Sequence, residues 1–250
     1  MMRIALIGTG NLAIHLVHAL EKCNAVELVQ WIGRNETPPK QIPNTPYFTR
    51  YQQNIDVDLC LISVTDDAIS SVAQQLKESD VLVAHTAGAV SMGELKTLKR
   101  KGVFYPLQSF KETIPVDWST VPICIEATNS EDLELLTKLA SQLSENVHQI
   151  YESQRLQLHT AAVFVNNFCN HLLGISQNIA ADASLPFSVL QPLIQETFER
   201  SFSNQAFAIQ TGPAKRNDTL TQQKHLSVLS EKHAALYRIL SQSIFNTHNT

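Results

Sequence analysis

A short glycine-containing segment near the start of the chain has residue types and spacing that suit a bound phosphate. The segment Gly8–Ala13 reads GTGNLA, and it follows an apolar run and precedes a helical pattern. Gly8 permits a tight turn, and Gly10 lets the backbone approach a pyrophosphate that a Cβ atom would collide with. The helix that follows points free N–H groups at the same place. The turn therefore predicts dinucleotide binding through Gly8, Gly10, Asn11 and Leu12, with a turn kept only for packing as the alternative.

The end of the second predicted strand carries a side chain that selects between cofactors. It reads Gly33-Arg34-Asn35, and the nearest acid, Glu36, comes after the strand end. An acid near this position suits the ribose 2′-hydroxyl of NAD, whereas an arginine suits the 2′-phosphate of NADP. Arg34 therefore predicts NADP rather than NAD, and the alternative is that it is a solvated loop residue.

Two further strand ends are expected at the cofactor crevice, because ligands bind outside the carboxyl ends of parallel strands. Val64 and Thr65 are predicted to contact the cofactor through their backbone, while Asp66 is suited to capping the next helix. His85 begins a His-Thr-Ala-Gly segment. It is a candidate proton carrier or ligand, with a local hydrogen bond that shapes the turn as the alternative.

Other candidate substrate contacts lie after a strand and in the second half of the chain. Gln108 and Ser109 could face the cleft, with a rigid connector as the alternative. On the long helical pattern, His159 and Asn166 lie two turns apart on one face, where they bind either a ligand or neighbouring helices. Arg216 precedes the last helical pattern and suits a carboxylate or phosphate, or an ion pair with Asp218.

The elements that must position these residues change in kind near residue 151. Before it, strands alternate with helices, which predicts a mainly parallel, doubly wound α/β Rossmann domain over residues 1–151. After it the patterns are helical, which predicts an all-α domain over residues 152–250. We expect strands at 3–7, 27–32, 57–64, 81–85, 103–105, 121–126 and 147–150. We expect helices at 12–21, 67–78, 92–101, 130–143, 154–181, 187–198, 203–209 and 219–245.

Composition excludes several classes of function. The chain has 250 residues, is 44% hydrophobic and carries a formal net charge of -4, which argues against nucleic acid or an anionic membrane as the main partner. No apolar run reaches the roughly 18 residues that span a bilayer. The four cysteines are widely spaced without a C-x-x-C pair, which indicates separate thiols in a reducing cytoplasm and no metal site.

Four motifs in order carry a resemblance to a known family. They are His85–Gly88, Pro106–Phe110, His159–Ala162 with Asn166, and Gly212–Asp218 with His225. The N-terminal pattern resembles NADP-dependent reductases with a helical C-terminal domain, such as ketopantoate reductase, pyrroline-carboxylate reductase and the β-hydroxyacid dehydrogenases. The four motifs resemble more closely a family with a Rossmann-like domain joined to domain of unknown function 2520. This resemblance implies two domains and a homodimer, formed through the helical domain, but no particular substrate.

The sequence departs from these reductases at one position. In β-hydroxyacid dehydrogenases and ketopantoate reductase, a lysine three or four residues before an asparagine is the general acid. Here Val163 occupies that position, and residues 154–181 contain no lysine. His159 is therefore the first candidate acid and His85 the second. Asn166 would orient the substrate, and Arg216 would bind its negative group.

Two functions follow from these features. The first is an NADP-dependent oxidoreductase that transfers hydride to or from a small anionic carbonyl, imine or hydroxy compound. The second is a sensor or scaffold dimer that binds NADP without chemistry, which the missing lysine motivates. A deazaflavin cofactor is a further alternative to NADP.

Overall fold

The computed structural model describes residues 1–39, 45–76 and 80–249, and these form two compact units. The first unit is Met1–Asn166 and the second is Asn167–Thr250. Composition changes near residue 151, whereas the division by contacts comes later, because the helix that starts at Glu152 makes its first contacts with the first unit. The domain boundary at residue 151 stays a prediction.

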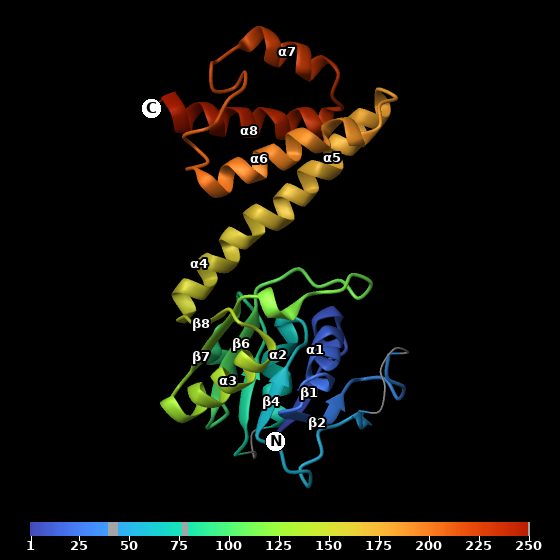
Figure 1. Ribbon diagram of the computed structural model, residues 1–250, viewed down its shortest axis with the longest axis vertical. Helices are drawn as coiled ribbons and strands as arrows, with labels where there is room; N and C mark the ends of the chain where they lie inside the picture. Colours follow the sequence, from blue (N-terminus) through green and yellow to red (C-terminus); the bar gives the residue numbers. More distant parts are fainter. Residues whose placement is uncertain (40–44, 77–79, 250) are drawn as a thin grey trace. The chain divides into compact units, whose positions relative to one another are not determined.

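One mainly parallel sheet forms the centre of the first unit (Figure 1). Its spatial order is β3-β2-β1-β4-β5-β6-β7-β8, and every neighbouring pair is parallel except β6 and β7. The strands are β1 (Met2–Ile7), β2 (Val26–Ile32), β3 (Tyr47–Phe48), β4 (Leu59–Ile62), β5 (Leu82–His85), β6 (Lys101–Pro106), β7 (Ile123–Ala127) and β8 (Val147–Gln149). The predicted fold class is confirmed, although the two-residue strand β3 was not predicted.

Helices cover both faces of this sheet, because the central strands bury side chains on both sides. Along β1, Ile4 and Leu6 belong to one buried cluster, while Ala5 and Ile7 belong to the other. Helices α1 (Asn11–Glu21) and α3 (Ser130–Leu143) pack on the first cluster, and α2 (Ile69–Gln75) packs on the second. The sheet is therefore doubly wound, as predicted.

The strand order places a topological switch point at the carboxyl end of β1. The chain passes from β1 to β2 and β3 on one side, then returns to β4 on the other side of β1. The loops after β1 and β4 consequently diverge at this switch point, where ligands bind in doubly wound folds.

Two helices predicted in the first unit differ from those observed. The expected helix at 92–101 is a short 3-10 helix, η2 (Met92–Leu95), and β6 begins at Lys101. Leu95 and Leu98 are buried and have helical spacing. However, the backbone hydrogen bonds here span three residues, as in a 3-10 turn, and one of them joins Leu98 N–H to the Leu95 carbonyl. The helix expected at 67–78 begins as the 3-10 helix η1 (Asp66–Ala68) and continues as α2, and its predicted end falls outside the described residues.

The second half of the chain is helical, as predicted, with different breaks. The expected helix at 154–181 consists of α4 (Glu152–Ala162), the π-helix η4 (Val163–Phe168) and α5 (Cys169–Asp182). The 3-10 helix η5 (Phe187–Leu190) leads into α6 (Gln191–Ser203). Each η4 turn is wider than an α-helical turn, a feature common at functional sites.

The last two helices predicted from the sequence differ from those in the structure, and both predictions are wrong in part. Residues 204–210 form turns rather than a helix, closed by bonds such as Ala208 N–H to the Gln205 carbonyl. The expected helix at 219–245 is two helices, α7 (Thr219–Ser227) and α8 (Glu231–Asn249). Ser230 separates them, because its hydroxyl accepts from the N–H of His233 at the start of α8.

The helices and the ionisable side chains of residues 1–39, 45–76 and 80–249 lack two features. None of the helices there combines the length and the apolar character that a membrane crossing demands. In the same ranges, no three histidine, cysteine or acidic side chains come together in a way that could hold a metal ion.

Candidate functional site

Gly8 is held in a conformation that a side chain would not tolerate. Its φ is 129°, and a Cβ atom there would lie 1.9 Å from the carbonyl oxygen of Ser63. Its N–H donates to the Ile32 carbonyl (2.8 Å), and its carbonyl accepts from Nε1 of Trp31 (2.7 Å). The turn after β1 is thereby fixed between the ends of β2 and β4.

Gly10 differs from Gly8 because the space beside it is open. It is the N-cap of α1, and no described atom lies within 4 Å of the position that its Cβ would take. No described side chain caps the helix, and its first turn contains no acid. Neighbouring Asn11 is exposed and Leu12 is half-buried. Free N–H groups and an open approach for a ligand are the features that a pyrophosphate requires, so the residues present fit a dinucleotide.

Arg34 follows β2 on a loop that other residues hold in place. Gly33 leaves room for Tyr47, whose Oη would lie 2.2 Å from a Cβ at position 33, and Tyr47 Oη donates to the Asn35 carbonyl (3.0 Å). Arg34 itself is exposed and makes no hydrogen bond or ion pair with the part of the chain that the structure describes. Its guanidinium is available to a ligand phosphate.

The residues after β4 line the other side of the switch point. Ser63 is buried, Val64 is half-buried and Thr65 is exposed. The N-cap of η1 is Thr65, whose carbonyl accepts from Ala68 N–H (2.9 Å), whereas Asp66 lies in the first turn. The capping role considered for Asp66 therefore belongs to the backbone of Thr65.

His85 is buried at the end of β5 and shapes the loop that follows. Its Nδ1 accepts from the N–H of Ala87 (3.2 Å). Burial, followed by the positive charge of Arg155, lowers the pKa of His85 to about 4. The ring is consequently neutral near pH 7, and its local hydrogen bond matches the structural role considered from the sequence.

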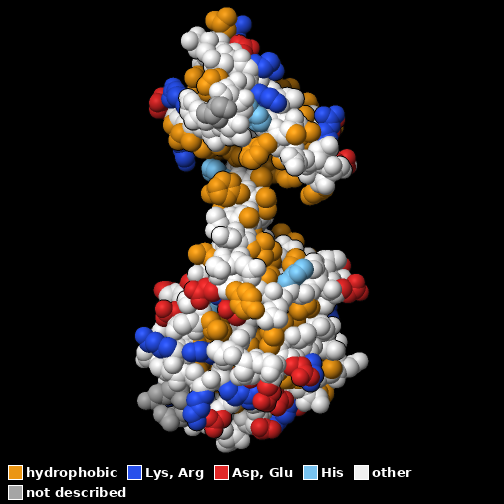
Figure 2. Space-filling view, turned by 90° about the vertical axis from the view of Figure 1, so that its left-hand side faces the viewer, with side chains coloured by type: hydrophobic (Ala, Val, Ile, Leu, Met, Phe, Trp, Pro, Cys, Tyr) orange, Lys and Arg blue, Asp and Glu red, His pale blue; other side chains and the backbone are white. Residues whose placement is uncertain are grey.

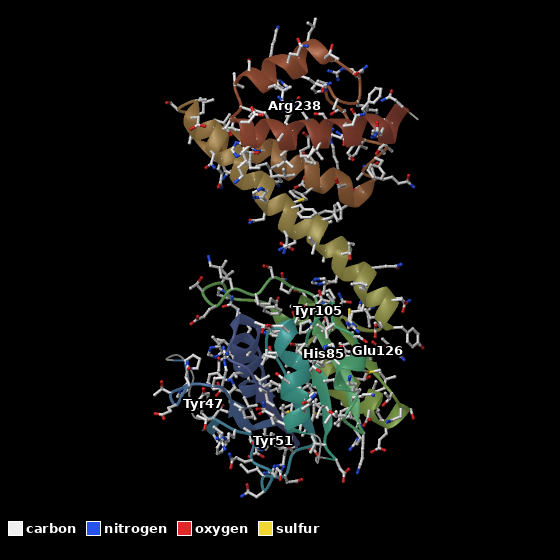
Figure 3. The ribbon with its side chains drawn as sticks, turned by 180° about the vertical axis from the view of Figure 1, so that it is seen from behind. Tyr47, Tyr51, His85, Tyr105, Glu126 and Arg238 are labelled. Carbon is white, nitrogen blue, oxygen red and sulfur yellow. The ribbon has the colours of Figure 1, made fainter. Side chains whose placement is uncertain are left out.

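A buried arginine fastens the same loop to α4. Arg155 is 1% exposed, and its Nη1 donates to the carbonyls of Ala87 (3.3 Å), Gly88 (3.1 Å) and Val90 (2.6 Å). Its Nη2 lies 3.4 Å from Oε2 of Glu126 on β7. Glu126, His85 and Tyr105 gather at one end of the sheet beside α4 (Figure 3). Arg155 is thus a paired internal cation that holds three loop carbonyls.

His159 meets a tyrosine one turn farther along α4. Tyr105 Oη lies 2.8 Å from Nδ1 of His159, and the two rings meet edge to face. Tyr105 is buried, and this burial raises its pKa to about 12. Gly88 makes the pairing possible, because a Cβ there would lie 2.5 Å from His159 Nδ1 and 2.6 Å from Tyr105 Cζ. His159 remains partly exposed, so the ring can still reach a ligand.

Asn166 lies in the π-helix and is exposed. The prediction that it shares a face with His159 assumes an unbroken α-helix. In the wider turns of η4, successive residues are separated by a smaller rotation about the helix axis than in an α-helix. Asn166 is therefore displaced from the position that α-helical spacing would give it on the face of His159.

Gln108 and Ser109 lie on an exposed loop after β6. Oε1 of Gln108 accepts from the N–H of Ser109 (2.7 Å), so part of the Gln108 side chain is used locally. The loop is anchored on α1, since Phe110 packs on His15, and His15 Nε2 lies 3.0 Å from the Lys111 carbonyl. The loop is therefore held beside the helix that starts at the glycine turn.

Arg216 belongs to the second unit. It is exposed, and it makes no hydrogen bond or ion pair within residues 1–39, 45–76 and 80–249. Asp218 caps α7 by accepting from Thr221 N–H (3.1 Å) and Oγ1 (2.7 Å), and these bonds lower the pKa of Asp218. The capping role considered for Asp218 is therefore observed.

The first unit gathers two of the predicted chemical residues, His85 and His159, around one loop. Sequence reasoning missed Tyr105, Arg155 and Glu126 as parts of this cluster. A signal existed for Arg155, because it precedes His159 by four residues and so lies on the same helix face. Tyr105 and Glu126 come from antiparallel neighbours, β6 and β7, whose pairing the sequence did not reveal.

Comparisons with known proteins agree with this architecture. A family model described as domain of unknown function (DUF2520) matches residues 121–244. A crystal structure from Bacteroides fragilis, named as a "putative NADP oxidoreductase", is 34% identical, covers 98% of both chains and has a TM-score of 0.88. No curated protein matches the chain.

Two more distant structures share the fold. Pyrroline carboxylate reductase from Plasmodium falciparum, with NADP bound, is 13% identical over 98% of both chains, with a TM-score of 0.61. 1-Pyrroline-5-carboxylate reductase from Streptococcus pyogenes is 16% identical over 99% of this chain and 98% of that one, with a TM-score of 0.63.

Proposed function

Because the chain belongs to the DUF2520 family of Rossmann-fold proteins, we propose that it is an NADP-dependent oxidoreductase. The observation that carries this function is the open backbone at Gly10, at the uncapped start of α1. The Bacteroides fragilis relative supports it, because its name gives the same cofactor and class of reaction. The substrate is a small anionic carbonyl, imine or hydroxy compound.

The cofactor is bound by residues at three strand ends. Gly8, Gly10, Asn11 and Leu12 receive the pyrophosphate, and the exposed guanidinium of Arg34 binds the 2′-phosphate. The backbone of Val64 and Thr65 lines the other side of the switch point. When bound, NADPH supplies hydride chemistry.

His159 is the proton donor that the geometry favours. Its ring is partly exposed, whereas His85 is buried, with Nδ1 already used by Ala87. In the reductive direction the protonated ring gives the proton on Nε2 to the substrate oxygen or nitrogen, then regains one from solvent. We propose that Asn166, Gln108 and Ser109 orient the substrate. In the second unit, the exposed guanidinium of Arg216 is suited to binding an anionic group.

Cofactor affinity tests the proposal directly. Titration calorimetry would compare NADPH and NADH for the natural chain and for Arg34→Ala. Loss of a charge-assisted contact predicts NADPH affinity weaker by about tenfold or more, with NADH affinity nearly unchanged. Arg50→Ala, a change at another exposed arginine, is the matched control. Equal NADPH affinity in both variants would remove the assignment of Arg34.

Turnover distinguishes an enzyme from an NADP-binding sensor or scaffold. The sensor is favoured by one observation, Val163, which stands where β-hydroxyacid dehydrogenases and ketopantoate reductase have a lysine. A panel of small keto acids and cyclic imines with NADPH, run with the natural chain and His159→Gln, decides between them. Turnover that falls in His159→Gln supports the enzyme, whereas tight NADPH binding without any turnover supports the sensor.

The helical unit supports a homodimer. Among its described residues, 167–249, the buried hydrophobic side chains are Ala180, Ala214 and Ala234, while Phe202 is 84% and Phe207 is 71% exposed. Figure 2 shows hydrophobic side chains gathered at the surface of this unit. Among residues 167–249, no apolar side chain larger than alanine is fully buried within one chain, so a second copy of the chain is proposed to cover the larger side chains.

Analytical ultracentrifugation would measure the mass of this assembly. We expect twice the chain mass for the natural protein and the single chain mass for Leu193→Asp, at an exposed apolar position of α6. Glu199→Asp, on the same helix, is the control. A monomeric natural protein would contradict the dimer. We also propose a cytoplasmic location, on the basis of the cysteine spacing.

A further inference from the structure

The pairing of Tyr105 with His159 uses one particular ring nitrogen. The phenol oxygen lies 2.8 Å from Nδ1, and Gly88 packs against the same edge of the ring. Nδ1 is therefore enclosed by Tyr105 and the loop after β5. The partial exposure of His159 leaves Nε2 as the ring nitrogen that a ligand can reach.

The phenol also decides where the proton sits on the neutral ring. Burial keeps the pKa of Tyr105 near 12, so the hydroxyl retains its own proton near pH 7. Within the described part of the chain the hydroxyl finds its acceptor in Nδ1, and a neutral imidazole that accepts at Nδ1 carries its proton on Nε2. When the ring is protonated, the hydroxyl turns and its oxygen accepts from Nδ1–H instead.

Buried contacts of Arg155 hold Tyr105 and His159 in place. Arg155 lies one turn earlier on α4 and binds the Gly88 carbonyl at 3.1 Å, which fixes the loop against both rings. Arg155 also reaches Glu126 on β7, the antiparallel neighbour of the strand that carries Tyr105. The distance between Tyr105 and His159 is thus set by buried contacts on α4, β6 and β7.

We propose that Tyr105 is a positioning residue that reserves Nδ1 of His159, so that Nε2 is the atom that binds and protonates the substrate. The role of Nε2 in catalysis rests on the proposed function. The tautomer of the ring does not, because Tyr105 imposes it without cofactor or substrate.

The second unit contains a natural control. His225 on α7 pairs with Tyr237 on α8 through the same atoms, with 2.8 Å between Nδ1 and Oη. Removal of the Tyr237 hydroxyl therefore perturbs a histidine of the same kind in the other unit, and it should leave His159 unchanged.

Two-bond proton–nitrogen spectra of the histidine rings test the tautomer on the full chain at about pH 8.5. The natural protein should show His159, assigned by its loss in His159→Gln, as a neutral ring protonated at Nε2. In Tyr105→Phe the nitrogen shifts of His159 should move toward a mixture of tautomers, while Tyr237→Phe should change only His225. A natural ring protonated at Nδ1, or an unchanged His159 in Tyr105→Phe, would overturn the proposal.

Steady-state kinetics then test the role of Tyr105 separately from the proposed oxidoreductase activity. For Tyr105→Phe we expect kcat to fall by about tenfold or more, with KM and NADPH affinity nearly unchanged. An unchanged kcat, in a protein that turns over substrate, would overturn the role of Tyr105 in proton transfer. If no substrate is turned over, the proposed function fails, whereas the spectra still decide the tautomer.

Discussion

Gly88 and His159 approach so closely that no side chain fits between them, because a Cβ atom at position 88 would lie 2.5 Å from Nδ1 of His159. We expect Gly88→Ala to push the two rings apart and to destabilise the fold by about 1–3 kcal/mol, as overpacking does. Denaturant unfolding measures the loss, and ring spectra measure the changed environment of His159.

A second glycine provides the matched control for this change. Gly174 lies inside α5 with no described atom within 4 Å of its Cβ position. Gly174→Ala should therefore stabilise the chain by about 0.5–1 kcal/mol, since alanine is the better helix former. Equal unfolding energies for the two variants would contradict the packing seen at Gly88.

The two glycines of the phosphate turn should respond differently to alanine. Gly8→Ala places a Cβ 1.9 Å from the Ser63 carbonyl at a φ of 129°, so we expect loss of stability. Gly10→Ala meets open space, so stability should change little while NADPH affinity falls. Thermal unfolding without ligand and calorimetric titration separate these effects. Unimpaired NADPH binding by Gly10→Ala would argue against the pyrophosphate at this turn.

Removal of a buried arginine should lower the free energy of unfolding much more than removal of an exposed arginine. Arg155→Met leaves Glu126 and three loop carbonyls without their donor, which predicts a loss of about 3–5 kcal/mol. Arg200→Met breaks an exposed pair with Glu196 on α6, which predicts about 0–1 kcal/mol. Urea unfolding of both variants checks this, and similar losses would show that Arg155 does not organise the loop.

Burial of His85 predicts how stability depends on pH. The unfolded ring takes up a proton near its usual pKa of 6.5, whereas the folded ring resists protonation until about pH 4. The unfolded state therefore binds more protons in this window, so stability is complete above pH 6.5 and decreases as the pH falls toward 4. The total decrease is on the order of 3 kcal/mol.

Unfolding at several pH values isolates this contribution. His85→Asn keeps an acceptor near the position of Nδ1 but does not titrate, so its stability should decrease less between pH 6.5 and 4. His171→Asn removes an exposed histidine of α5 and should retain the natural profile. An identical pH profile for His85→Asn and the natural protein would contradict the buried, neutral state of His85.

Patterns of residues that are close along the chain determine much of the secondary structure of the first unit. Ile4 and its neighbours in β1 form an apolar run, and Gly8 after them has a φ of 129°, a backbone conformation that favours glycine. Such signals survive in one sequence because the residues that create them are close along the chain. The strands other than β3, the doubly wound class and the tight turn at Gly8 were predictable for that reason.

Contacts across the sequence decided the rest. Tyr105 and His159 are separated by 54 positions, and Arg155 reaches carbonyls more than 60 positions away, so neither pairing leaves a local pattern. The π-helix η4, which contains Asn166, is likewise absent from a helical periodicity, because one wide turn barely alters the spacing of apolar residues. The sequence alone determined that a dinucleotide turn precedes a histidine on a long helix. Only the tertiary structure decided which nitrogen of that histidine is free, since Tyr105 and Gly88 reach it through the packing of β6, the loop after β5 and α4.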